Sequence, residues 1–412
     1  MKEGKKSGSK KWKKVALVVG ATGTAGHGVV DYLLEKDDWQ VLALSRAIKE
    51  GHKKNLVTIK GDLLEPRLLE SQLKGYEVTH LFYLAMERDH ASQSLKLFFG
   101  VRFIKFWLRV ASFFLPFINF LLIPPLRGFY FDFIDKLGGA SDLDGKNSRM
   151  FQNITHVLEK TSSSLSHIGL ISGGKYYGIH LGPSLNPSWK IPFEEDDPRY
   201  FEGKNYYFKM EDFLKKRAEE KAYNWTILRT NFIVGFSEGS PYNLGPSLAI
   251  YAVLLKELNL PLIFPGDRKT YKATWEVCSS TGLGRMFEWA VEKNEVFNYT
   301  SGCPFSWEDV WPKLAEYFCM TPHLKKGGFS CHKFFKKNGH LWEIIAKRHN
   351  LKGYKLSELA NPDFIDNSMI LDWNVVYSMK KAKKYGYAEE EDPSKIFLDL
   401  FNSLKEKGVI PS

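Results

Sequence analysis

Residues 15–34 read VALVVGATGTAGHGVVDYLL, and this stretch decides the fold class. The apolar run at 15–19 predicts a buried strand, and a helix-like segment begins at residue 24. Between them stand Gly20, Gly23 and Gly26. Glycines at this spacing let the backbone turn tightly and approach a pyrophosphate, which then lies at the helix N-terminus. The strand before the loop and the helix after it supply the context that a dinucleotide-binding loop requires.

Short apolar runs alternate with helix-like segments through the first half of the chain. Strands are expected over 15–20, 39–45, 56–62, 78–86, 167–172 and 225–230, with helices over 24–36, 147–161 and 206–224. This alternation predicts an α/β fold with a doubly wound parallel sheet of the Rossmann type. Beyond about residue 235 the pattern loosens, which indicates a smaller lobe at the C-terminal ends of the strands, where ligands of such sheets bind.

The expected organisation has three parts. Residues 1–14 form a basic flexible tail, and residues 15–235 form an NADP-binding Rossmann domain with an aromatic-rich insertion at about 95–146. Residues 236–412 form a substrate-binding lobe, from which some segments return to the Rossmann core.

Composition and charge set the broad class of the protein. The chain has 412 residues, 44% of them hydrophobic and 25% charged, which is ordinary for a globular protein. The net charge is +11, but seven lysines lie in the first 14 residues. We interpret this tail as a solvated arm. Contact of the arm with a membrane surface or nucleic acid stays open as the alternative, although no nucleic-acid partner is expected.

Targeting signals and cysteines indicate the compartment. The apolar run after the tail is too short and too rich in glycine for a signal peptide. The four cysteines form no CxxC pair, so we expect no metal site and a reducing, cytoplasmic environment.

Residues 95–135 interrupt the alternation with an aromatic-rich run. Residues 110–126 carry no charge, but three prolines break them, which makes a spanning helix a poor interpretation. An interfacial hairpin with a basic face, in contact with a membrane surface through residues 97–126, fits better. Two alternatives remain, a cap over the core or substrate entrance and an insertion without a native partner.

The end of the second strand indicates which dinucleotide binds. NAD sites usually have a carboxylate there to hold the ribose hydroxyls, whereas this chain has Ser45 and Arg46. These side chains accommodate a 2′-phosphate, so NADPH is the expected cofactor. Asp62, after the third strand, is placed to meet the adenine amino group, or to cap a helix over 63–75.

Lys175 follows the fifth strand in LISGGKYYGIH (170–180). A lysine there often assists a tyrosine four residues earlier, but that position is Ile171. Two literal YxxxK matches, Tyr200–Lys204 and Tyr377–Lys381, are interpreted as incidental. A better candidate is NYYFKMED (205–212), because the helix that it starts can bring a tyrosine toward Lys175 from across the site.

At these two segments the sequence resembles a known family. SGGKYYG and NYYFKMED are similar to the TGxKHYxGP and NFYYxxED motifs of the progesterone 5β-reductase/iridoid synthase (PRISE) family. Its members are atypical short-chain dehydrogenases/reductases, within the epimerase/dehydratase superfamily, that reduce activated C=C bonds. WTILRTNFIVGFSEGSPYNLG (225–245) and YAVLLKELNLPLIFPG (251–266) also resemble family segments. The resemblance covers nearly all of 15–412 except the aromatic insertion.

The resemblance implies roles for individual residues. Lys175 matches the family's catalytic lysine, and Tyr207 matches its catalytic tyrosine. Besides the three loop glycines, the cofactor contacts that it implies are Thr22, Thr24, Ser45, Arg46, Asp62, Leu63, Ala85, Met86, Ser172, Ile233 and Ser240. The chain departs from the family at Ala85-Met86, which replaces Thr-Trp, at Tyr176, which replaces His, and at Thr230, which replaces Pro.

The activity that the resemblance implies is NADPH-dependent 1,4-reduction of a small hydrophobic enone of terpenoid or steroid type. Tyr207 would stabilise the enolate with Lys175 assisting. A homodimer is the assembly considered for the chain. Residues expected to line the substrate pocket are Phe236, Tyr242, Tyr251 and Trp275. Two alternatives stay open, an NADP-dependent carbonyl reductase of the same fold and a non-catalytic NADP-binding sensor.

Overall fold

The computed structural model describes residues 12–48, 53–87, 140–184, 186, 188–200, 205–240 and 243–412. Most of the basic tail and residues 88–139, which include most of the aromatic insertion, lie outside the described residues. The expected membrane contact through residues 97–126 therefore stays a prediction.

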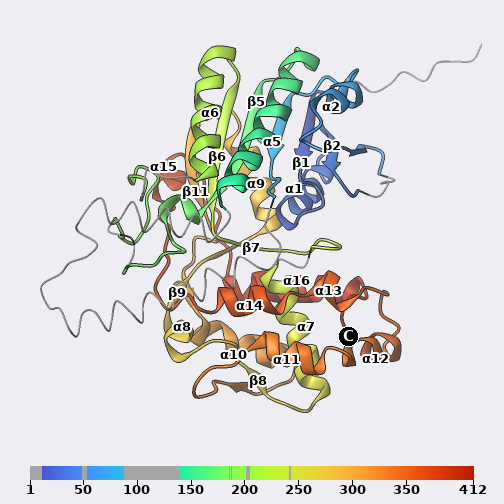
Figure 1. The fold of residues 1–412 in the computed structure, drawn as a ribbon, viewed down its shortest axis with the longest axis vertical. Coiled ribbons are helices and arrows are strands. Elements are labelled where there is room, and N and C mark those ends of the chain that lie inside the picture. The colour runs from blue at the N-terminus through green and yellow to red at the C-terminus, as the bar shows by residue number, and fades with distance from the viewer. Residues whose placement is uncertain are drawn as a thin grey trace, which may run out of the picture.

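A seven-stranded parallel sheet forms the upper half of the molecule in Figure 1. Its strand order is β11-β6-β5-β4-β1-β2-β3. The strands are β1 (Lys14–Val19), β2 (Trp39–Ser45), β3 (Leu56–Lys60), β4 (His80–Tyr83), β5 (His167–Gly173), β6 (Asn224–Thr230) and β11 (Glu295–Tyr299). The predicted doubly wound sheet is confirmed. Six of its strands are those expected from the sequence, and the seventh comes from beyond residue 235.

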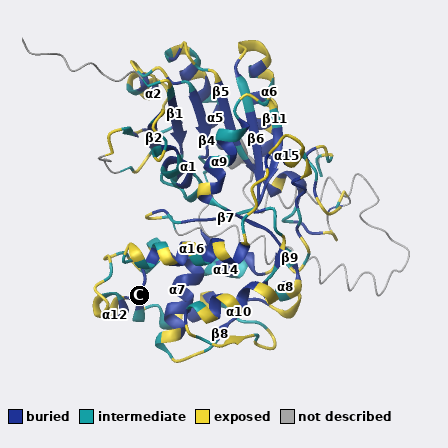
Figure 2. Cartoon of the chain, turned by 180° about the vertical axis from the view of Figure 1, so that it is seen from behind, coloured by how far each residue is buried: buried dark blue, intermediate teal, exposed yellow. Residues whose placement is uncertain are grey.

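Helices cover both faces of the sheet. One face packs against α2 (Pro66–Leu73), α5 (Ala140–Thr161) and α6 (Tyr206–Lys221), and the other against α1 (Thr24–Leu34) and α9 (Ser280–Ala290). Burial on both faces explains why the central strands read as continuous apolar runs. In Figure 2 the central strands are accordingly mostly dark blue, whereas the edge strand β3 is only partly buried.

The lower half of the molecule is a helical lobe with its own core. Its central helix, α7 (Leu244–Glu257), is buried over residues 244–255, as a helix that is apolar all round must be. The helices packed around it include α10 (Trp307–Tyr317), α11 (Cys331–Asn338), α14 (Pro362–Ser368) and α16 (Pro393–Glu406).

The remaining elements are short. They are β7 (Phe232–Val234), β8 (Leu262–Ile263), β9 (Thr274–Trp275), β10 (Val277–Ser279), β12 (Phe305–Ser306), β13 (Pro322–His323), α8 (Arg268–Lys272), α12 (Leu341–Arg348), α13 (Leu356–Leu359) and α15 (Lys380–Lys384), with the 3-10 turn η2 (Gly174–Tyr177) after β5.

The chain reverses its winding between β1 and β4. From β1 it proceeds to β2 and β3 on one side, and the later strands build outward from β4 on the other. Ligands of such sheets bind outside the carboxyl ends of the strands at this switch point. The two loops meet closely there, because a Cβ on Gly20 would stand 2.8 Å from the backbone nitrogen of Ala85. Gly20 also has a φ of +83°, which favours glycine.

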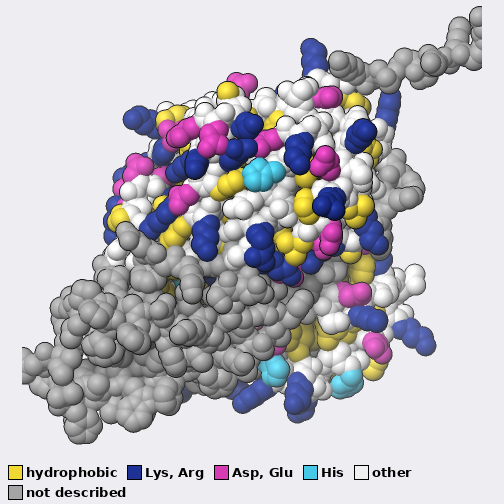
Figure 3. All heavy atoms as spheres, turned by 45° about the horizontal axis from the view of Figure 1, so that its top comes forward, with side chains coloured by type: hydrophobic (Ala, Val, Ile, Leu, Met, Phe, Trp, Pro, Cys, Tyr) yellow, Lys and Arg dark blue, Asp and Glu magenta, His cyan; other side chains and the backbone are white. Residues whose placement is uncertain are grey.

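The surface of the described residues carries charges of both signs. Figure 3 shows lysines and arginines interspersed with acidic side chains over the coloured part of the face it presents. No helix in the described ranges combines the length and the apolar character that a bilayer crossing requires.

Two histidines are buried in the sheet at the start of adjacent strands. The rings of His80 in β4 and His167 in β5 lie 5.9 Å apart. Burial lowers the pKa of His80 to about 4, and burial together with the nearby His80 lowers the pKa of His167 to about 3. An unfolded histidine titrates near 6.5, so the unfolded chain binds more protons below that pH. The two histidines therefore contribute fully to the free energy of unfolding above pH 6.5. That contribution is lost as the pH falls toward their pKa values in the folded protein.

Replacing His167 with leucine should flatten the acid side of the stability curve. Because His167→Leu removes one of these protonations, lowering the pH from 7 to 5 should cost the variant about 2 kcal/mol less free energy of unfolding than it costs the wild type. Urea denaturation at pH 7, 6 and 5 measures this difference. The exposed His349 provides the control, since His349→Gln should leave the pH dependence unchanged. An unaltered slope in His167→Leu would show that His167 is not held neutral.

Candidate functional site

The loop after β1 forms a cradle that fits a pyrophosphate. A Cβ on Gly26 would collide with the carbonyl group of Gly20, so the helix approaches the loop closely at this point. Gly23 is the N-cap of α1 and offers no side chain to the N–H groups of the first turn. Those donors and the positive end of the helix dipole are the usual partners of a dinucleotide phosphate.

Two residues that lie more than 200 positions later in the sequence hold this loop in place. Ser237 Oγ donates to the Thr22 carbonyl at 2.6 Å, and Asn243 Nδ2 donates to Thr24 Oγ1 at 2.9 Å. The Thr22 and Ser45 hydroxyls lie 2.6 Å apart and join the loop to the end of β2. Sequence reasoning missed Ser237 and Asn243. Asn243 also caps α7, and an asparagine before a helical run was the signal available.

The adenosine side of the site lies at the ends of β2 and β3. Arg46 Nη1 lies 3.0 Å from Glu87 Oε2, an ion pair that was not anticipated. Asp62 Oδ1 accepts from Leu64 N at 2.9 Å. The following helix, α2, begins at Pro66 with Glu65 as its N-cap, so the expectation that Asp62 caps this helix is wrong. Its carboxylate instead closes the tight turn at residues 62–64, before the helix begins.

Lys175 and Tyr207 are linked through one side chain. Asn205, the N-cap of α6, donates from Nδ2 to the Lys175 carbonyl at 3.1 Å and accepts from Tyr207 N at 3.0 Å. The Tyr207 hydroxyl lies 3.0 Å from the position that a Cβ on Gly173 would occupy. The first turn of α6 thus directs this hydroxyl to the carboxyl end of β5, two residues before Lys175.

A buried ion pair connects α6, which carries Tyr207, to the end of β6. Arg229 at the end of β6 meets Glu211 of α6 in a two-pronged contact, with Nη2–Oε2 at 2.8 Å and Nε–Oε1 at 3.2 Å. Both side chains are almost fully buried, with 2% and 1% of their surface exposed. Burial alone would lower the pKa of Arg229, but the Glu211 carboxylate and the Tyr177 hydroxyl raise it above its ordinary value. Glu211 lies one helical turn after Tyr207, so the pair restrains the turn that carries the tyrosine.

The same arginine anchors the segment that follows Lys175. The guanidinium carbon lies 3.2 Å from the centroid of the Tyr176 ring, and Nη1 donates to the Tyr177 hydroxyl at 3.2 Å and to the Glu195 carbonyl at 2.9 Å. Arg229 therefore connects β6, α6 and η2 at once. It explains why tyrosine at position 176 is compatible with this fold.

Polar atoms without partners gather around the same segment. Among the described residues, the Ser172 hydroxyl, the Tyr377 hydroxyl and His180 Nδ1 are buried and form no hydrogen bond. A Cβ on Gly174 would collide with the Tyr377 hydroxyl. Burial, together with the positive charge of Lys175, lowers the pKa of His180 to about 3, which keeps its imidazole neutral.

Of the two literal YxxxK matches, the structure describes both residues of Tyr377–Lys381 alone, and these two do not pair. Tyr377 precedes α15, and Lys381 Nζ instead pairs with Glu295 Oε2 at 2.6 Å. Lys204 lies outside the described residues, whereas Tyr200 belongs to the aromatic cluster beneath η2.

The remaining predicted cofactor residues lie on several elements. Ala85 touches the loop at Gly20, and Met86 Sδ accepts from the Tyr206 hydroxyl at 3.0 Å. Leu63 is buried, and its carbonyl accepts from Asn153 Nδ2 at 2.8 Å. Ser172 stands at the end of β5, Ile233 lies in β7, and Ser240 lies in the segment whose Ser237 contacts Thr22. Their contacts with a cofactor stay predictions.

Some residues expected to line the substrate pocket belong to the core instead. Tyr251 and Trp275 are both buried within the helical lobe, and the Tyr251 hydroxyl donates to the Ile263 carbonyl at 3.0 Å. The expectation was wrong for these two because sequence alone does not separate an aromatic at a pocket from one in a core. Tyr242 lies outside the described residues.

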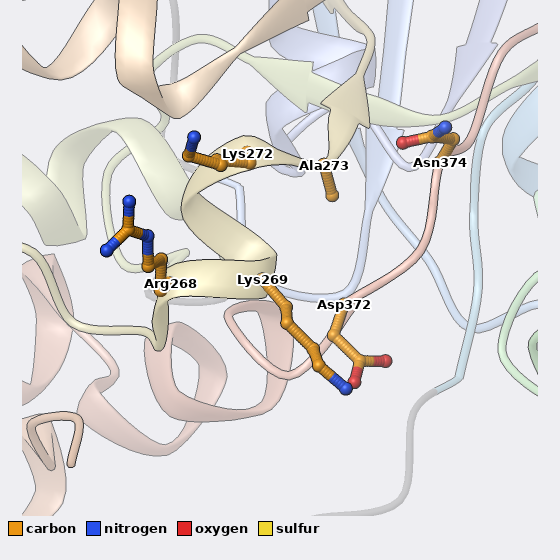
Figure 4. A pocket seen from close by; sticks show the side chains of 6 residues that line it. All are labelled: Arg268, Lys269, Lys272, Ala273, Asp372 and Asn374. Carbon is orange, nitrogen blue, oxygen red and sulfur yellow. The ribbon is translucent and has the colours of Figure 1, made fainter.

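Two hollows of ligand size lie elsewhere on the described surface. One, of about 430 Å³, is lined by Arg268, Lys269, Lys272, Ala273, Asp372 and Asn374 and is shown in Figure 4. Its basic side chains come from α8, and those of Lys269 and Asp372 point toward each other. The other, of about 550 Å³, adjoins α15 and Glu295. Neither contains Lys175, Tyr207 or a residue of the β1 loop, so we assign the chemistry to the sheet edge on geometry.

No group of three or more His, Cys, Asp or Glu side chains in the described ranges could hold a metal ion. The donors at the sheet edge are instead backbone N–H groups, hydroxyls, Lys175 and Arg46. This set fits the phosphates of a dinucleotide.

Comparison with known families gives two matches. The family described as "PRISE-like Rossmann-fold domain" matches residues 127–411, and the "NAD dependent epimerase/dehydratase family" matches residues 16–97.

Individual relatives align over nearly the whole chain. The chain is 26% identical over 416 residues to (S)-8-oxocitronellyl enol synthase of Antirrhinum majus, covering 97% of this chain and 94% of that protein. It is 24% identical over 421 residues to 3-oxo-Delta(4,5)-steroid 5-beta-reductase of Arabidopsis thaliana, covering 98% and 95%. The structure of dTDP-glucose 4,6-dehydratase from Bacillus anthracis, in complex with NAD, superposes with a TM-score of 0.56 at 12% identity, covering 95% and 97%. That likeness shows the extended Rossmann fold.

Removing the charge of Glu211 should strongly destabilise the fold. Glu211→Gln leaves Arg229 buried without its counter-ion, so we expect a loss of about 3–5 kcal/mol in the free energy of unfolding. The matched control is the next residue of the same helix. Asp212 pairs with Arg199 at 2.5 Å but is 59% exposed, and Asp212→Asn should cost less than about 1 kcal/mol. Urea denaturation measures both, and equal losses would contradict the special role of the buried pair.

Proposed function

The chain belongs to the family of PRISE-like Rossmann-fold domains, and from that membership we propose that it is an NADPH-dependent reductase of activated C=C bonds. Its relatives include enzymes named as a steroid 5-beta-reductase and an oxocitronellyl enol synthase. The proposed reaction is the 1,4-reduction of an α,β-unsaturated carbonyl compound. The observation that carries the proposal is the Tyr207 hydroxyl directed to the end of β5, next to Gly173 and two residues before Lys175.

NADPH would supply the hydride that adds to the β-carbon of the enone. As that bond forms, negative charge develops on the carbonyl oxygen, and a fixed donor at that oxygen stabilises the enolate. Tyr207 is the proposed donor. Lys175 is proposed to favour the charged form of the tyrosine, which makes its hydroxyl a better acid. Asn205 holds these two residues in position relative to each other, because its side chain forms hydrogen bonds with the backbone of both.

The choice of NADPH over NADH rests on the end of β2. Ser45 and Arg46 stand where NAD sites commonly have a carboxylate, and Arg46 is largely exposed, with 63% of its side-chain surface accessible. The substrate class is proposed from the relatives' names, a steroid and an oxygenated terpenoid. Ala85 and Met86, in place of Thr-Trp, present smaller and more flexible side chains beside the loop, which favours a bulkier or more adaptable ligand.

The second candidate is carbonyl reduction by the same residues, because a tyrosine at the oxygen also serves 1,2-addition. The products separate the two reactions. A saturated carbonyl compound indicates reduction at C=C, whereas an allylic alcohol indicates reduction at C=O. A non-catalytic NADP-binding protein is the third candidate, for which dinucleotide binding without turnover is the expected behaviour.

Tyr207→Phe should reduce turnover by about 100-fold or more, because a donor to the developing oxyanion is lost. The assay follows NADPH absorbance with small cyclic enones and a terpenoid dialdehyde, and products are identified by mass spectrometry. NADPH binding and the thermal midpoint should stay near wild-type values, since the variant keeps the aromatic ring.

The matched control lies at the other end of the helical region. Tyr223 follows α6, and its hydroxyl donates to Glu159 at 3.3 Å, far along the helix from Gly173. Tyr223→Phe should keep wild-type turnover. Full activity of Tyr207→Phe on an enone that the wild type reduces would refute the assignment of the donor.

A further inference from the structure

We propose that Glu87 sets the cofactor preference by competing with a 2′-phosphate for Arg46 and Lys146. This inference rests on the proposed function, because it concerns the same nucleotide site. Glu87 lies two residues beyond Ala85, which touches the loop at Gly20, so it stands at the switch point of the sheet.

Glu87 makes two ion pairs at once. Its Oε2 lies 3.0 Å from Arg46 Nη1, and its Oε1 lies 3.0 Å from Lys146 Nζ. Both carboxylate oxygens are therefore engaged by cations, one from the end of β2 and one from α5. The Glu87 side chain is 17% exposed, against 63% for Arg46. Arg46 is thus the accessible partner and Glu87 the sheltered one.

The backbone of Glu87 is held as firmly as its side chain. Glu87 N donates to Asn147 Oδ1 at 2.8 Å, and Asn147 Nδ2 donates to the Glu87 carbonyl at 3.1 Å. Asn147 is 1% exposed and follows Lys146 on the same helix. Two successive residues of α5 therefore fix Glu87. The carboxylate has little freedom to move away when a ligand approaches Arg46.

The charges predict opposite effects on the two dinucleotides. Arg46 and Lys146 together carry two positive charges, and Glu87 cancels one of them. A 2′-phosphate brings between one and two negative charges to this cluster, so the fixed carboxylate opposes it. The unphosphorylated ribose of NADH meets no such repulsion, and a carboxylate beside it can accept hydrogen bonds from the ribose hydroxyls, as in NAD sites. In NAD sites that carboxylate usually stands after the second strand, whereas here it comes from the loop after β4, four residues beyond Tyr83.

The wild-type protein should therefore bind both dinucleotides, and Glu87→Gln should sharpen the preference for NADPH. We expect the Kd for NADPH to fall about tenfold in the variant, while the Kd for NADH stays unchanged or rises. Fluorescence titration of the full chain measures both without turnover. Adenosine 2′,5′-bisphosphate and 5′-AMP, titrated by calorimetry, test whether the change resides at the 2′-position.

A matched control removes a carboxylate elsewhere. Glu70 on α2 pairs with Lys160 at 3.5 Å, and Glu70→Gln changes the net charge by the same amount. It should alter neither Kd. The gain from Glu87→Gln should also shrink in an Arg46→Met background, because the phosphate would have lost its principal partner.

The outcomes separate this inference from the proposed function. An unchanged ratio of the two Kd values in Glu87→Gln, with NADPH still bound by the wild type, would overturn the role of Glu87 alone. A loss of affinity for both dinucleotides would also overturn it, since Glu87 would then act as a structural support. Failure of the wild type to bind either dinucleotide would contradict the proposed function and this inference together.

Discussion

The ion pair between Arg229 and Glu211 is the constraint on which the candidate site depends. Two charges taken out of water are tolerated only when they are paired and their remaining hydrogen-bonding groups are satisfied. Arg229 meets this requirement through both oxygens of Glu211, the Glu195 carbonyl and the Tyr177 hydroxyl. The end of β6, the first turns of α6 and the segment after β5 must therefore come together for any of them to be stable.

That constraint explains how the proposed catalytic pair can be arranged differently from the usual YxxxK helix. The tyrosine and the lysine lie on separate segments, and their relative position depends on contacts between those segments. Asn205 bonds the backbone of both, and Tyr176, the residue after Lys175, stacks on Arg229. The tyrosine thereby reaches the carboxyl end of β5 without sharing a helix with the lysine.

The sequence was sufficient for features set by local patterns and insufficient for those set by pairing at a distance. Continuous apolar runs identified six strands, and the glycine spacing identified the loop at the switch point. The return of β11 to the sheet was less visible, because its run EVFNY is short and lies beyond residue 235, where the alternation of strands and helices loosens. Arg229 and Glu211 are separated by 18 positions and belong to different elements, so nothing local indicates that they meet. The role of Glu87 is likewise not indicated by any local pattern, since its partners Arg46 and Lys146 come from the end of β2 and from α5.

Local reasoning also failed where two local structures compete. Asp62 resembles a helix cap, but Pro66 and Glu65 delay the start of α2, and the aspartate instead closes a turn. Large aromatics of the helical lobe were similarly ambiguous. Tyr251 reads equally well as a pocket wall, yet its hydroxyl finds a carbonyl inside the core.

The most direct test of the proposed chemistry is the destination of the transferred hydrogen. The wild-type enzyme would be given NADPH deuterated at C4 of the nicotinamide together with a cyclic enone, and the product would be analysed by NMR. Deuterium on the β-carbon of a saturated ketone is the expected result, because the donor at the carbonyl oxygen stabilises the enolate of 1,4-addition. Deuterium on the carbinol carbon of an allylic alcohol would contradict the proposal and assign the site to carbonyl reduction.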